Sequence, residues 1–146
     1  MMDIRKLIKA KILANNLYRA IGTKVEAETK DLTAANAAQL LKGSGLIVDV
    51  FDNSASRQAV RDYADHTGIP CLHAGLSADY AEVIWNEVYR VPSDVNDDVC
   101  DYPLARNLVM LTVAVACEAI VSFVVTGEQR HFTITLKDLS VQSLNL

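Results

Sequence analysis

Several signatures that would assign a function at once are missing from this sequence. It has no Cys-x-x-Cys pair, and its three cysteines (Cys71, Cys100 and Cys117) are odd in number and widely spaced, which argues against a disulfide framework. No basic tract stands out among 14 Lys and Arg against 18 Asp and Glu, so we expect no nucleic-acid partner. No signal-peptide pattern opens the chain, and we expect a cytoplasmic protein. No Gly-x-Gly-x-x-Gly fingerprint occurs, which leaves a dinucleotide-dependent oxidoreductase without support.

The composition that remains is that of a globular domain. Apolar residues make up 51% of the 146 positions and charged residues 22%, which excludes a disordered chain. This length is enough to bury one proper core. No repeat, linker or low-complexity segment divides the chain, so we predict a single domain over residues 1–146.

The most informative stretch runs from Leu46 to Arg57. Its first part is apolar and β-branched apart from Asp49, which predicts a buried strand of a parallel sheet. Asp52, Asn53 and the serine after them favour a turn and a helix N-cap, and a helical pattern follows over residues 56–67. The turn would therefore lie at the carboxyl end of a strand, the edge at which open α/β sheets bind their ligands.

The other expected elements complete an α/β pattern. We predict a helix over residues 4–21, a short strand over 25–29, and a helix over 33–41 that leads through a β-α-β crossover to the central strand. Strands are expected over 70–76, 81–85 and 129–137, with an acidic loop over 91–101. The predicted fold is a partial Rossmann-like, mostly parallel sheet flanked by helices, with a long apolar helix and a C-terminal strand pair.

The long apolar helix is predicted over residues 103–125. Between Leu108 and Val125 the only charged residue is Glu118, and this length reaches the threshold for a membrane span. A carboxylate near mid-span costs roughly 3 kcal/mol on insertion. We therefore expect no membrane, and predict a helix buried between the sheet and a partner subunit.

The pattern Asp49-x-x-Asp52-Asn53-x-x-x-Arg57 after a buried strand resembles the second signature of the ThiF/MoeB/HesA family. These proteins are bacterial relatives of the ubiquitin-activating enzymes, and the resemblance runs from about Lys9 to about Gly127. It implies ATP- and Mg²⁺-dependent adenylation of the C-terminus of a ubiquitin-like or sulfur-carrier protein. It also implies a homodimer or a complementing chain. The family's glycine-rich ATP loop would precede residue 1, so the chain corresponds to the second half of the domain and would be incomplete alone.

The resemblance also assigns roles to single residues. Asp52 matches the aspartate that contacts magnesium, and Asn53 and Arg57 belong to the same nucleotide-binding motif. Lys9 matches the lysine that reaches the nucleotide phosphates, with Lys11 as the alternative. Structural interpretations stay open beside these: a solvated basic helix face for the lysines, a helix cap for Asp52 or Asn53, and a subunit salt bridge for Arg57.

Cys100 is the only cysteine that we place in a loop, and some family members carry a nucleophilic cysteine there. Its acidic neighbours disfavour a thiolate, so an ordinary exposed cysteine is the alternative. We expect no zinc, because the zinc-bearing relatives use two Cys-x-x-Cys pairs. Cys71 and His73 are expected in the core, and Asp49 is expected to be hydrogen-bonded and structural.

Three explanations fit a half-domain: a piece of a longer enzyme, one half of a split enzyme, or a natural short protein that lost the chemistry. The competing function is therefore a non-catalytic dimerisation or scaffold module built on the same fold.

Overall fold

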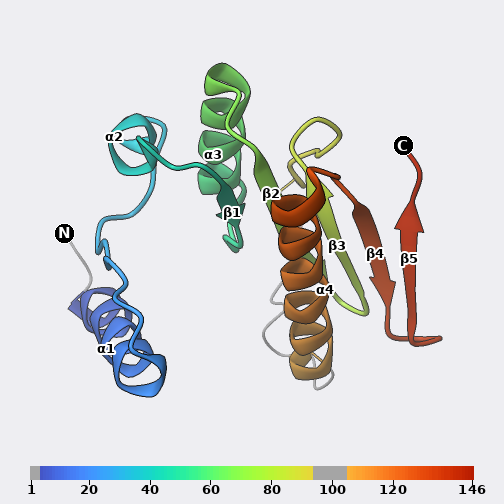
Figure 1. The fold of residues 1–146 in the computed structure, drawn as a ribbon, viewed down its shortest axis with the longest axis horizontal. Helices are drawn as coiled ribbons and strands as arrows, with labels where there is room; N and C mark the ends of the chain where they lie inside the picture. Colours follow the sequence, from blue (N-terminus) through green and yellow to red (C-terminus); the bar gives the residue numbers. More distant parts are fainter. Residues whose placement is uncertain (1–3, 94–104) are drawn as a thin grey trace.

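The computed structural model describes residues 4–93 and 105–146, and it contains a five-stranded sheet with helices packed on it (Figure 1). The strands lie in chain order, β1 (Ile47–Asp49), β2 (Cys71–Ser77), β3 (Tyr80–Trp85), β4 (His131–Thr135) and β5 (Ser140–Leu144). The α/β class, the flanking helices, the long apolar helix and the C-terminal strand pair are confirmed.

The strand directions differ from the mostly parallel sheet that the sequence predicts. Only β1 and β2 are parallel, joined through α3 (Ser54–Thr67), and the three other strand pairs are antiparallel. The connection between β2 and β3 explains the difference. Only Ala78 and Asp79 separate these strands, with Ala78 at a positive φ of 54°. A parallel connection needs a crossover of a dozen or more residues, whereas two residues close a hairpin.

Residues 4–46 form helices but no strand. Helix α1 spans Ile4–Ile21 as predicted, and α2 is shorter than expected, at Ala37–Leu41. The strand predicted over residues 25–29 is wrong, because that segment pairs with no strand of the described sheet. A strand is stable only when a neighbour satisfies its backbone groups. The predicted crossover into β1 is therefore not formed, and β1 is an edge strand rather than a central one.

Helix α3 begins and ends at the residues whose chemistry favours those positions. The Asn53 side chain accepts a hydrogen bond from the Ser56 backbone N–H at 2.8 Å, which caps the first turn. Gly68 ends the helix with φ at 71°, a left-handed conformation that glycine adopts without strain. Between these caps, Val60 and other small apolar residues bury one helix face against β1 and β2.

Helix α4 (Ala105–Thr126) lies across β2, β3 and β4. Leu108, Ala116 and Ala119 are buried on its inner side, and Phe123 packs on the Trp85 ring at 4.6 Å between centroids. Its outer side is apolar and exposed. By length and composition alone, Arg106–Thr126 is the one helix of the described chain that would suffice to cross a membrane. The predicted packing of α4 against the sheet is confirmed, whereas its packing against a partner subunit stays a prediction.

Candidate functional site

The predicted acidic turn lies directly after β1. Asp52 and Asn53 are both exposed, and the Asn53 amide also donates to Oδ1 of Asp52 at 3.4 Å. Asn53 is therefore the helix cap, as the structural interpretation proposed. Asp52 does not cap the helix, and its carboxylate is free to reach solvent beside the N-terminus of α3.

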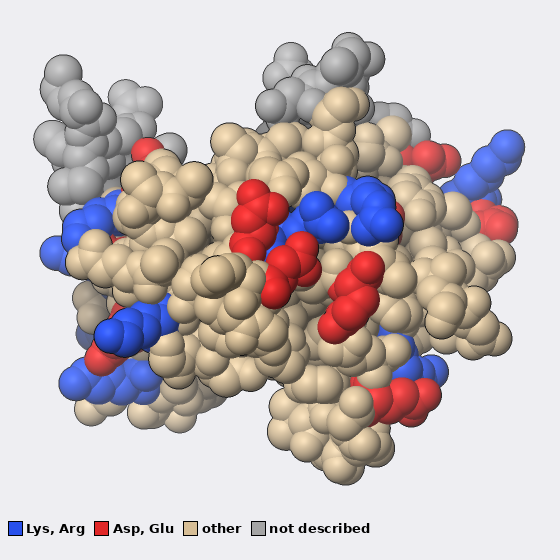
Figure 2. Space-filling view, turned by 90° about the horizontal axis from the view of Figure 1, so that it is seen from above, with Lys and Arg blue, Asp and Glu red and all other residues tan. Residues whose placement is uncertain are grey.

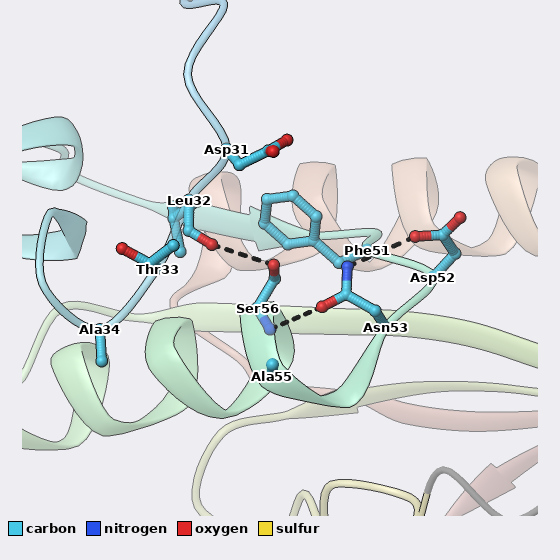
Figure 3. Close-up of a pocket in the computed structure, with 9 residues that line it drawn as sticks. All are labelled: Asp31, Leu32, Thr33, Ala34, Phe51, Asp52, Asn53, Ala55 and Ser56. Carbon is cyan, nitrogen blue, oxygen red and sulfur yellow. Dashed lines mark hydrogen bonds between the residues drawn. The ribbon is translucent and has the colours of Figure 1, made fainter. Parts of the chain in front are cut away.

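A hollow of about 600 Å³ opens next to this turn (Figure 3). Its walls come from two segments, residues 31–34 and residues 51–56, which face each other in the close-up. The Ser56 hydroxyl joins them by donating to the Leu32 carbonyl at 3.0 Å. The backbone N–H groups at a helix N-terminus favour anions, so a phosphate group would be stabilised at this edge.

The oxygen ligands at this edge suit a magnesium ion that arrives bound to a nucleotide. Mg²⁺ takes hard oxygen ligands and is held by one or two carboxylates, with phosphates and water completing its shell. Asp52 offers one such exposed carboxylate. Among residues 4–93 and 105–146, no group of three His, Cys, Asp or Glu side chains is close enough to hold a metal ion by itself. A metal here would therefore depend on the phosphates of its ligand.

Beneath the turn, a buried ionic network surrounds Asp49. One carboxylate oxygen of Asp49, Oδ2, accepts from Nη1 of Arg57 at 3.3 Å, and the other, Oδ1, accepts from the Phe51 N–H at 2.9 Å. Arg57 also donates to the Ala74 carbonyl at 2.9 Å and to the Tyr89 hydroxyl at 3.1 Å. The expectation that Asp49 is hydrogen-bonded and structural agrees with this geometry. Arg57 is also buried, and it holds the turn from below rather than lining the hollow.

The Arg57 guanidinium lies beside Gly75, which leaves room for it because glycine has no side chain. A Cβ atom at this position would lie 3.0 Å from Nη2 of Arg57, closer than side-chain contacts normally allow. Glu82 is the partner of Gly75 on β3. Burial raises the pKa of the Glu82 carboxyl, and the positive charge of Arg57 opposes that rise.

His73 completes the network from β2. It is fully buried, its Nδ1 lies 2.7 Å from Oδ2 of Asp49, and its ring stacks on Tyr89 with 3.7 Å between centroids. Cys71, two residues earlier on the same strand, is buried as well, and burial raises the pKa of its thiol to about 12. Its expected place as an unreactive core thiol agrees with this environment.

The remaining predicted site residues lie elsewhere. Lys9 and Lys11 are exposed on α1, and none of the described residues that line the hollow belongs to that helix. In Figure 1, α1 lies apart from the sheet. Cys100 lies outside the described residues. Seen from above, acidic and basic side chains are interspersed on the surface rather than gathered into one basic face (Figure 2). The site assignments of Lys9, Asp52, Asn53, Arg57 and Cys100 stay predictions.

Two members of the network were not predicted from the sequence: Tyr89, and Asn86, whose Oδ1 lies 2.6 Å from Nε2 of His73. Both follow β3 in a short turn, and no residue spacing marks them as partners of β1 or β2. The available hint was Asp49, because a carboxylate inside a buried strand requires cationic or hydrogen-bonding partners from other elements.

The described structure is an α/β domain in which an acidic turn follows β1 and caps α3. The sequence matches the ThiF family over residues 3–133, and the chain belongs to that family. It is 31% identical over 80 residues to the sulfur carrier protein ThiS adenylyltransferase of Bacillus subtilis (strain 168), a match covering 53% of this chain and 24% of the relative.

Solved structures support the same fold. The E. coli MccB structure is similar with a TM-score of 0.65 at 12% identity, covering 94% of this chain and 46% of MccB. The PaaA structure has a TM-score of 0.59 at 14% identity, covering 94% of this chain and 55% of PaaA. The matched region is therefore about half of each solved relative and about a quarter of the curated one.

Proposed function

We propose that this chain supplies the carboxyl-edge half of the adenylation site of a ThiF-type activating enzyme. The complete enzyme would use ATP and Mg²⁺ to adenylate the C-terminus of a ubiquitin-like or sulfur-carrier protein. The observation that supports this proposal is the exposed Asp52 carboxylate beside the N-terminus of a 14-residue helix and an open hollow. The name of the curated relative, an adenylyltransferase of the sulfur carrier ThiS, supports the same reaction class.

The reaction sets clear requirements for the side chains. A carboxylate oxygen of the partner's tail displaces pyrophosphate from the α-phosphorus, so negative charge must be neutralised on the leaving group. Asp52 would contact the magnesium that accompanies the nucleotide. Asn53 would hold the first turn of α3 in place, and Arg57 would hold the Asp49 end of β1. Lys9, or Lys11, would reach the phosphates, which requires α1 to lie closer to the turn in the assembled enzyme.

A thermal-shift titration with MgATP tests the nucleotide site in this chain. The variant Asp52→Asn removes the proposed magnesium contact, and Asp62→Asn removes another exposed charge further along α3 as the control. We expect MgATP to raise the melting temperature of the wild type and of Asp62→Asn, with the shift lost in Asp52→Asn. An unchanged melting temperature of well-folded wild type at millimolar MgATP would reject nucleotide binding by this chain alone.

The proposed role of Cys100 has its own test. If its thiolate attacks the acyl carbon of the adenylated tail, AMP leaves and a thioester with the carrier protein forms. Hydroxylamine cleaves this thioester, and Cys100→Ser abolishes it. Adenylate formation that proceeds unchanged in Cys100→Ser, without any trapped thioester, would make Cys100 an ordinary cysteine.

A second candidate function, a dimerisation or scaffold module, is favoured by the outer side of α4. Exposed side chains there include Met110, Val113 and Val124, which are 72%, 56% and 70% exposed. An apolar surface of this kind marks a contact with another protein. We propose a homodimer that covers it.

Sedimentation of two lysine variants tests this surface. Val113→Lys places a charge at the centre of the outer side of α4, and Leu139→Lys places one at an exposed apolar residue of the β4–β5 turn. We expect only Val113→Lys to convert a dimer to a monomer. A wild type that sediments as a monomer at high concentration would exclude the homodimer.

A further inference from the structure

His73 lies between two oxygen acceptors in the core. Its Nδ1 is 2.7 Å from Oδ2 of Asp49, and its Nε2 is 2.6 Å from Oδ1 of Asn86. A neutral imidazole carries one proton and can donate to only one of them. At the other nitrogen, two lone pairs would then face each other at hydrogen-bonding distance, with no water to separate them because His73 is fully buried.

The Asn86 amide cannot resolve this conflict by turning over. In the orientation found, its Nδ2 donates to the Asp65 carboxylate and lies 3.5 Å from the Arg61 carbonyl. Reversing the amide would place Oδ1 against both of these acceptors and leave Nδ2 without either bond. The surroundings of Asn86 therefore fix its oxygen as the atom that faces His73.

Cys71 offers the alternative partner for Nε2. Its sulfur lies 3.4 Å from that nitrogen, and a thiol can donate weakly. The Asn86 oxygen is much closer, however, and a proton on Nε2 satisfies it directly. Because burial raises the pKa of Cys71 to about 12, the thiol stays neutral and adds no negative charge.

The charges around the ring balance a positive imidazole. Asp49 on β1 contacts it directly, and Tyr89 stacks its electron-rich face on the ring at an angle of 6° between planes. The titratable and charged groups that face His73 from the surrounding elements are Asp49, Arg57, Asp65, Cys71, Glu82 and Tyr89. With a proton on each ring nitrogen of His73, two cations would stand among three carboxyl groups.

We propose that His73 is a buried imidazolium, protonated on both nitrogens in the native protein, and that it is a positioning residue for the acidic turn. It donates to Oδ2 of Asp49, and Oδ1 of the same carboxylate holds the Phe51 N–H, one residue before Asp52. The protonation state rests on the fold alone. Only its relevance to a nucleotide rests on the proposed function.

Long-range ¹H–¹⁵N spectra of histidine-labelled protein test the protonation state. Burial lowers the pKa of His131, whose Nδ1 accepts from the Trp85 N–H, so this imidazole is neutral at about pH 8 and is the reference in the same sample. We expect both ring nitrogens of His73 to resonate as protonated nitrogens while His131 shows one protonated and one bare nitrogen. A bare nitrogen on His73 at this pH would overturn the proposal. This result does not depend on whether the chain binds MgATP.

Amide hydrogen exchange tests the positioning role. His73→Gln removes the cation beside Asp49, and His66→Gln is the matched control on the helix surface. We expect the Phe51 amide to exchange about tenfold faster in His73→Gln, the factor for a hydrogen bond weakened by about 1.4 kcal/mol. Amides in the centre of α4 should be unchanged, which separates this effect from general unfolding. Wild-type exchange at Phe51 in folded His73→Gln would refute the positioning role.

Discussion

Removing the Arg57 side chain should destabilise this protein more than any change on the outer face of α3. In Arg57→Ala, the Ala74 carbonyl and the Tyr89 hydroxyl lose their donor, and Asp49 keeps only His73 and one backbone N–H. Breaking a buried ion pair by removing one partner costs about 3–5 kcal/mol. That is a large share of the roughly 5–15 kcal/mol that stabilises a typical domain.

Urea denaturation followed by circular dichroism measures this loss. With a slope of about 2 kcal/mol/M, a loss of about 3–5 kcal/mol lowers the urea midpoint by roughly 2 M. Arg61→Ala is the matched control one turn along the helix, because its partner Asp65 is 3.8 Å away and half exposed. Such surface pairs contribute about 0–1 kcal/mol.

A third variant separates charge from geometry. Arg57→Lys keeps the positive charge but loses the planar fork that reaches Asp49 and Ala74 together, so we expect an intermediate midpoint. If Arg57→Ala lowers the midpoint no more than Arg61→Ala does, the network contributes nothing to stability.

Three further outcomes follow from the same region and its neighbours. Gly75→Ala should lower the free energy of unfolding by about 1–3 kcal/mol in urea titrations, because the new methyl group displaces the buried guanidinium. At pH 8 a maleimide should leave Cys71 unlabelled in the native protein and label it in the unfolded chain, as peptide mapping would show, because the buried thiol with its pKa raised to about 12 forms almost no thiolate. Burial lowers the pKa of His131, whose Nδ1 accepts from the Trp85 N–H, so the unfolded chain binds this proton more readily and stability should fall as the pH drops below about 6.5.

For each of these three predictions, one experimental result would contradict it. Gly75→Ala with wild-type stability would mean that the guanidinium has room to move. Native labelling of Cys71 at the rate found for the unfolded chain would mean that β2 opens readily. For His131, the comparison is His131→Asn, whose side-chain oxygen keeps the acceptor without the titration. An equal loss of stability with acid in both proteins would assign the effect to other groups.

The elements with strong local signals were predictable from the sequence. The bounds of α1 and the end of α3 follow from helical periodicity and from Gly22 and Gly68, whose chemistry acts within one turn. Helix α3 begins at Ser54, directly after its cap Asn53 and slightly before the predicted start at residue 56. The acidic turn after β1 was predictable for the same reason. The segment 25–29 was not, because alternation states only that a strand is possible, and a strand forms only where a partner edge is present.

The buried network around Asp49 also combines features that the sequence predicts with features that only the fold decides. The sequence alone places Asp49 inside a buried strand and Arg57 on the following helix, which predicts that both are anchored. That they share a site with His73, Tyr89 and Asn86 depends on β1 and β2 pairing in parallel and on β3 folding back beside them.

The sequence by itself therefore determined the family, the α/β class and the residue types of the acidic turn, since these depend on local patterns. The tertiary structure alone decided which strands are antiparallel, that β1 lies at the edge, and that Arg57 points inward while Asp52 points to solvent. These are properties of contacts between residues far apart in the chain. Such contacts form only where burial and charge pairing offset the entropic cost of ordering the backbone. That balance depends on several segments together, so the sequence of one segment does not determine it.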